Sequence, residues 1–257
     1  MICLSFDIEE FDMPLEYNGK IPFEEQISVS RKGTEIILDL LKKYEIKATF
    51  FSTVVFAENN QDIIQRLLKE GHELASHTYY HSQFKIEDLK KSKDRLEELF
   101  GKKIYGLRMP RMMNVDEKEV QKAGYFYDSS VNPTFLPGRY NNLHISRRSF
   151  MDSGVLQIPA SVTPRFRFPL FWLSFHNLPL SMYLEMAKTT YLHDNFLNIY
   201  FHPWEFMDIK KKSYQLPFYA KRNVGKKMIE RFEKFLAWIN DNEYATNTLK
   251  EYAELQV

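Results

Sequence analysis

Acidic residues and histidines stand directly after several β-prone runs in this 257-residue chain. Asp7 and Glu9 follow a short apolar run at the N-terminus, and His77 and His81 are separated by four positions. A spacing of four places two imidazoles on one face if a helical turn begins there. Two histidines and one carboxylate form an open zinc site with room for water. These residue types therefore predict an open metal site.

The elements that must position these side chains alternate between strand and helix. β-Prone runs occupy residues 2–6, 47–55, 73–76, 104–107, 125–129, 155–158 and 197–201. Apolar residues at helical spacing or helix stop signals predict helices over residues 31–44, 62–70, 86–100, 116–123, 226–240 and 248–255. This alternation predicts an α/β fold with about seven parallel strands and right-handed crossovers.

Arg108 and His202 also end predicted strands. In a parallel α/β barrel, active sites assemble at the carboxyl ends of the strands. The length suits one such barrel, and neither a repeat nor a linker-like composition shift divides the chain. We therefore expect a single domain over residues 1–257, with the polar groups gathered at one end of the barrel.

Composition narrows the classes of protein to consider. A formal net charge of +1 gives no sign of the basic surface that binds nucleic acid. No apolar run is long enough to span a membrane. The single cysteine, Cys3, excludes an intramolecular disulfide and a cysteine-based zinc site. The N-terminus lacks the features of a secretory signal, so we expect a cytoplasmic protein. No feature of the sequence indicates an oligomeric state.

Residues 166–180 combine five aromatic residues with two prolines and one arginine. Proline excludes a regular helix through most of this segment. Two interpretations remain open: a loop packed over the barrel, or a lip that faces a substrate or a lipid.

Several segments resemble the polysaccharide deacetylases of carbohydrate esterase family four, the NodB-homology domain. The most specific is residues 71–81 (GHELASHTYYH). The others are residues 5–9 (SFDIE), 48–51 (ATFF), 108–110 (RMP), 124–130 (GYFYDSS) and 200–205 (YFHPWE). The last two resemble the branch found among exopolysaccharide and capsule deacetylases. The resemblance implies a distorted (β/α) barrel with about seven parallel strands and an N-acetylated carbohydrate substrate.

The resemblance also implies roles for the metal side of the site. Glu9, His77 and His81 would hold a divalent metal, with Zn²⁺ the expected ion. Asp7 would be the general base that takes a proton from the attacking water, and Arg108 would keep Asp7 ionised and aimed.

Further roles follow on the leaving-group side. His202 would be the general acid, with Asp128 as its partner. The backbone N–H of Arg111 would stabilise the oxyanion, and Trp204 would form part of the groove beside the acetyl methyl group. We expect Glu205 to be structural.

The first motif departs from the commonest family form, which has two adjacent aspartates. Ile8 occupies the second position and cannot bind a metal, whereas Glu9 fits the acid-x-acid variant of the motif. Two alternatives to a metal-dependent deacetylase therefore stay open. One is a metal-independent hydrolase of a small cyclic or linear amide, and the other is a catalytically inactive sugar-binding module.

Overall fold

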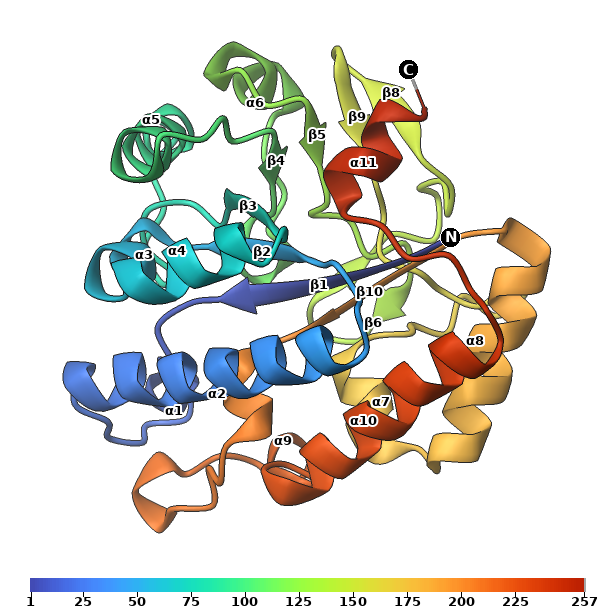
Figure 1. Ribbon diagram of the computed structural model, residues 1–257. Helices are drawn as coiled ribbons and strands as arrows, with labels where there is room; N and C mark the ends of the chain where they lie inside the picture. The colour runs from blue at the N-terminus through green and yellow to red at the C-terminus, as the bar shows by residue number, and fades with distance from the viewer. Residues whose placement is uncertain (257) are drawn as a thin grey trace.

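The computed structural model describes residues 1–256 and is built around one curled, mostly parallel β-sheet (Figure 1). The strand order is β10-β1-β2-β3-β4-β5-β9-β8, and every neighbouring pair is parallel except β8 and β9. Helices lie around the outside of the sheet. The predicted distorted (β/α) barrel is confirmed.

The seven predicted strands are the seven parallel strands of the sheet. They are β1 (Ile2–Ile8), β2 (Thr49–Ser52), β3 (Glu73–Ser76), β4 (Gly106–Leu107), β5 (Tyr127–Asp128), β9 (Val155–Gln157) and β10 (Leu197–Phe201). All seven residues of β1 are buried, as expected for a parallel strand covered on both faces. The sequence analysis did not predict the antiparallel β8 (Phe150–Asp152) or the small hairpin of β6 (Phe135–Leu136) and β7 (Tyr140–Asn141).

The sheet curls until the chain after β9 meets β10. The backbone N–H of Ser161 donates to the carbonyl of Asn198 at 2.9 Å. The amide side chain of Asn198 donates to the carbonyls of Ile158 and Pro159, both at 3.2 Å. These bonds bring the last parallel strands beside the first ones, so the carboxyl ends of β1, β3, β4 and β10 face a common space.

The six predicted helices are present, with shifted ends. They are α2 (Phe23–Lys43), α4 (Gln61–Lys69), α5 (Asp88–Phe100), α6 (Glu117–Ala123), α10 (Lys226–Asp241) and α11 (Leu249–Glu254). The helices that were not predicted are α1 (Met13–Glu16), α3 (Val54–Asn59), α7 (Trp172–Asn177), α8 (Leu180–Asp194) and α9 (Phe218–Lys221). Within residues 1–256, no helix is both long and apolar enough to cross a bilayer.

Helix α2 packs directly on the turn that follows β10. A Cβ added at Gly33 would lie 2.0 Å from the carbonyl oxygen of Pro203, so only glycine fits at this contact. Pro203 follows His202, and this close packing helps to fix the end of β10 where the histidine stands.

The segment 166–180 contains a short helix after all. Helix α7 spans six residues between Pro169 and Pro179, so the prolines limit the helix without abolishing it. Its first residues, Trp172 and Leu173, line the pocket described next.

Candidate active site

A pocket of about 270 Å³ opens at the carboxyl ends of the parallel strands. Asp7 lies near the end of β1, whereas His77, Arg108 and His202 each directly follow the last residue of β3, β4 and β10. The parallel register aligns these ends, since Ile8 pairs with Ser52, Ser52 with Ser76, and Ser76 with Leu107. The predicted gathering of the polar groups at one edge of the sheet is therefore present.

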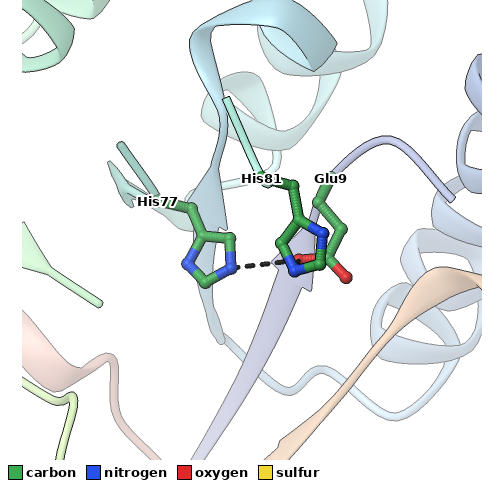
Figure 2. A group of neighbouring side chains, drawn as sticks. All are labelled: Glu9, His77 and His81. Atoms are coloured by element: carbon green, nitrogen blue, oxygen red, sulfur yellow. Dashed lines mark hydrogen bonds and ion pairs between the residues drawn. The ribbon is translucent and has the colours of Figure 1, made fainter. Parts of the chain in front are cut away.

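Glu9, His77 and His81 form a buried cluster whose ligand atoms all lie within 4.8 Å of one another (Figure 2). Oε2 of Glu9 lies 3.0 Å from Nε2 of His77 and 3.1 Å from Nε2 of His81. The two imidazole rings are nearly parallel, with centroids 5.9 Å apart. The three residue types and their separation suit a divalent cation.

A loop brings the two histidines together, and the helical turn expected at residues 77–81 is absent. Thr78 has a φ of +64°, which interrupts a right-handed helix directly after His77. The expected proximity of the two rings was right, but the backbone that produces it is irregular.

The ring nitrogens that face away from the cluster both have hydrogen-bond partners. Nδ1 of His77 lies 2.8 Å from the carbonyl oxygen of Arg108, and Nδ1 of His81 lies 2.7 Å from Oδ1 of Asp12. Burial by itself would lower the pKa of His81, but the charge of Glu9 and the bond to Asp12 raise it to about 9. Asp12 is a site residue that the sequence alone did not reveal, since its only signal is its position as an acidic residue close after Glu9.

Asp7 is held by the fully buried guanidinium of Arg108. Nη1 of Arg108 donates to Oδ1 of Asp7 at 2.7 Å, and the rest of the group is fixed by bonds to Ser5 and Ser129. Burial favours the neutral carboxyl, but the positive charges of Arg108, His77 and His202 more than offset this effect and lower the pKa of Asp7. The carboxylate is therefore ionised at neutral pH.

His202 stands beside Asp7, at the end of the neighbouring strand β10. Its Nε2 lies 3.8 Å from Oδ2 of Asp7, and its Nδ1 lies 2.9 Å from Oε1 of Glu205. Oε2 of the same glutamate is 2.8 Å from Nε2 of His176. Burial would lower the pKa of His202, but the bond to Glu205 and the nearby carboxylates raise it above its ordinary value.

Asp128 is not the partner of His202, which corrects the expectation from the sequence. Its carboxylate accepts a hydrogen bond from Ser130 and lies beside Glu117, and it is only 1% exposed. Burial raises the pKa of Asp128 to about 6. Glu205, three residues after His202, makes the expected contact instead, because the turn after β10 folds its side chain back onto the histidine.

Trp204 also occupies a different place from the one expected. It is 1% exposed and does not line the pocket; its ring stacks on His202 with centroids 5.2 Å apart. Trp172 of α7 lines the pocket and meets the ring of His202 edge-on at 5.6 Å. The two tryptophans therefore hold the histidine from two sides, and only Trp172 is open to a ligand.

Arg111 lies at the pocket rim, on a turn with left-handed backbone at Arg111 and Met112. Its Nη2 lies 2.7 Å from Oε1 of Glu16, which also lines the pocket. This ion pair joins the loop after β4 to helix α1 across the mouth of the site.

Comparison with known proteins begins with a family model. The model described as polysaccharide deacetylase matches residues 20–127. The matched part includes His77, His81 and Arg108, whereas Asp7, Glu9 and His202 lie outside it.

A curated relative matches part of the chain. The peptidoglycan-N-acetylmuramic acid deacetylase PdaA of Bacillus subtilis (strain 168) is 32% identical over 104 residues, or 36% of this chain and 39% of that protein. The first matches among curated proteins cover only 24–39% of those proteins' own lengths.

Two solved structures cover almost the whole chain. A probable polysaccharide deacetylase from Pseudomonas aeruginosa PAO1 has a TM-score of 0.67 at 14% identity, covering 98% of this chain and 89% of that one. The Puue allantoinase has a TM-score of 0.63 at 15% identity, covering 98% and 88%. At such identities the likeness shows the fold alone. The chain thus resembles polysaccharide deacetylases in sequence over residues 20–127 and in fold over almost its whole length.

Proposed function

We propose that this protein is a metal-dependent carbohydrate N-deacetylase, a hydrolase that removes the acetyl group from an N-acetylated sugar in a polysaccharide or a glycan biosynthetic intermediate. The observation that carries the proposal is one pocket that holds a Glu-His-His cluster, an ionised aspartate and a histidine beside that aspartate. Each of these three parts supplies something that amide hydrolysis needs.

The donor set fits a divalent metal on physical grounds. The carbonyl of Arg108 can only accept a hydrogen bond, so Nδ1 of His77 donates to it and Nε2 is the nitrogen that faces Glu9. A cation or a proton between Nε2 of His77 and the carboxylate oxygen of Glu9, which lie 3.0 Å apart, would satisfy both atoms. Two imidazole nitrogens and one carboxylate oxygen suit Zn²⁺.

Glu9, His77 and His81 would hold the metal. When bound, it would polarise the acetyl carbonyl and lower the pKa of a water molecule.

Asp7 is placed to act as the general base. Its Oδ1 is taken by Arg108, which leaves Oδ2 on the side that faces His202. The lowered pKa keeps this oxygen available to accept a proton from the attacking water. Arg108 thus acts by orienting Asp7 and by keeping it charged.

His202 is placed to protonate the leaving group. Glu205 binds Nδ1, so Nε2 points at the pocket, where an amine expelled from the sugar would need a proton. The raised pKa keeps the imidazolium populated near neutral pH. The backbone N–H of Arg111 would donate to the oxyanion, and Trp172 takes the place beside the substrate that was expected for Trp204.

The alternative of a metal-independent amide hydrolase has one observation in its favour. Ile8 stands where the commonest family form has an aspartate, and an allantoinase shares the fold. The buried cluster of Glu9, His77 and His81, with its ligand atoms within 4.8 Å of one another, favours the metal-dependent reaction.

The decisive experiment measures metal content and acetate release in the same preparations. The purified protein should contain about one divalent metal per chain and release acetate from a member of a panel of N-acetylated glycans. His81→Ala should lose the metal and the activity together. Asp7→Asn should keep the metal and lose most turnover, and Glu9→Gln should weaken metal binding.

The possible results separate the three functions. Full acetate release by a preparation stripped of metal would leave the metal-independent hydrolase. A protein that binds metal and glycan yet never releases acetate would be the inactive module. If Asp7→Asn empties the metal site and Glu9→Gln does not, the two carboxylates have exchanged roles.

A further inference from the structure

A second hollow adjoins the catalytic pocket and is lined mainly by apolar side chains. We call it the apolar groove; its volume is about 410 Å³ and its principal walls are Phe135, Leu136, Phe166, Phe168, Pro169 and Leu178. The catalytic pocket and the apolar groove share four lining residues: Leu136, Phe171, Leu173 and Tyr219. A molecule with its reactive end in the pocket can therefore continue into the groove.

Polar side chains in the apolar groove already have partners inside the protein. Thr134 donates to the carbonyl of Arg167 at 2.5 Å, Ser174 to that of Phe171 at 2.8 Å and Asn177 to that of Leu173 at 2.9 Å. The remaining two are also engaged: Nη1 of Arg167 donates to the carbonyl of Ile145 at 2.8 Å, and the hydroxyl of Tyr219 lies 2.9 Å from that of Tyr17.

This arrangement disfavours additional sugar units in the apolar groove. Sugar hydroxyls that leave water need new hydrogen-bond partners, and a buried polar group without one costs free energy. A hydrocarbon chain needs no hydrogen-bond partners, and its binding becomes more favourable as more of its apolar surface leaves water.

The rim of the apolar groove exposes large aromatic side chains to solvent. Phe166 is 89% exposed, Phe135 53% and Phe168 39%. Clustered exposed apolar groups mark binding surfaces more often than isolated ones do. Here they stand beside a hollow that shares four lining residues with the catalytic pocket, which favours a part of the substrate as their occupant.

We propose that the substrate is an N-acetylated sugar with a long apolar aglycone, and that the apolar groove binds this chain while the acetamide lies at Asp7 and His202. This inference rests on the proposed deacetylase activity and names the class of its substrate. The groove contributes binding energy, and the chemical step is the same amide hydrolysis.

The experiment compares methyl, octyl and dodecyl glycosides of an N-acetylhexosamine, each below its micelle concentration. In the unmodified protein kcat/KM should rise with chain length, by at most roughly four-fold for each methylene that enters the groove. The double variant Phe166→Ser/Phe168→Ser should bring the dodecyl-to-methyl ratio toward one. Leu192→Ser, a control at an exposed leucine on α8, should keep the ratio of the unmodified protein.

Each outcome bears on a different proposal. Turnover of all three glycosides with equal kcat/KM overturns the apolar-chain inference and leaves the deacetylase intact. If no glycoside is deacetylated, calorimetric binding of the dodecyl glycoside decides, and equal binding by the double variant overturns the inference. Phosphatidylcholine vesicles are the remaining probe: binding that depends on Phe166 without any chain-length effect assigns the groove to a membrane surface instead.

Discussion

The two walls of the pocket use histidine in the same way but support it differently. On the metal wall, His77 and His81 present Nε2 to Glu9, and on the acid wall His202 presents Nε2 to Asp7. All three rings are fixed through Nδ1. The partner of His202 is Glu205, which is fully buried. In the proposed function, the pocket thus separates a cluster that would hold a cation from a histidine that would supply a proton.

The orienting groups differ less than the proposed roles do. His77 is oriented by a backbone carbonyl and His81 by the carboxylate of Asp12, and both kinds of partner suit an imidazole that binds a metal through Nε2. His202 is also oriented by a carboxylate, that of Glu205, so the proposed difference in role comes from what Nε2 faces: Glu9 on the metal wall and Asp7 on the acid wall. The family match includes the histidines of the metal wall and excludes His202, so the role of the acid wall depends on geometry and should be tested first.

Among the substitutions that leave the metal bound, removal of the His202 side chain should produce the largest loss of activity. His202→Ala should lower kcat by roughly 10²- to 10⁴-fold, because an amine leaves poorly without a proton. The metal content, measured by elemental analysis, should not change. His193→Ala is the matched control, since this histidine is exposed near the end of α8.

An activated ester tests whether the loss is specific to proton donation. An aryl acetate has a leaving group that needs no proton, so its hydrolysis should suffer far less in His202→Ala. Equal losses on the amide and the ester would mean that the substitution damaged the site, and the division between a metal wall and an acid wall would fail.

The metal wall should respond to loss of an orienting group by weaker metal binding. Asp12→Ala removes the carboxylate on Nδ1 of His81 and should reduce metal affinity by roughly 10- to 100-fold. Glu16→Ala is the control, because this carboxylate pairs with Arg111 and touches neither histidine. Competition with a chelator measures both affinities. Unchanged metal affinity in Asp12→Ala would show that Asp12 does not support metal binding by His81.

The elements of the fold were predictable because their signals are local. Runs such as residues 47–55 are rich in β-branched and aromatic residues, and the core of each parallel strand falls inside such a run. Helix α8 was missed because its apolar residues are spread around the helix. The backbone at Thr78 could not be foreseen, since a positive φ at threonine depends on the surrounding loop.

For the site, the sequence could predict individual candidate residues at strand ends, and it could not predict their contacts with one another. Asp12 and His81 are 69 positions apart, and His176 and Glu205 are 29 apart, so only the folded chain brings them together. Asp128 follows a strand as well, but its carboxylate packs against Ser130 and Glu117. Position at a strand end therefore identifies candidates, and tertiary contacts select among them.

The smallest expected effect is a shift of pH dependence on the acid wall. Glu205→Gln removes the charge beside Nδ1 of His202 while keeping the size of the side chain. The folded pKa of His202 is raised above its ordinary value of about 6.5, and the bond to Glu205 is the largest of the contributions that raise it. A general acid works while protonated, so activity falls as pH rises through that pKa.

The variant should therefore lose activity at a lower pH than the unmodified protein does. The basic limb of the profile of kcat/KM reports the free enzyme and should move toward acid, whereas the acidic limb should stay in place. Because Glu205 also accepts from His176 in the core, thermal unfolding should be measured in parallel to confirm that the variant is folded. A folded variant whose basic limb does not move would mean that a group other than Glu205 sets the pKa of His202.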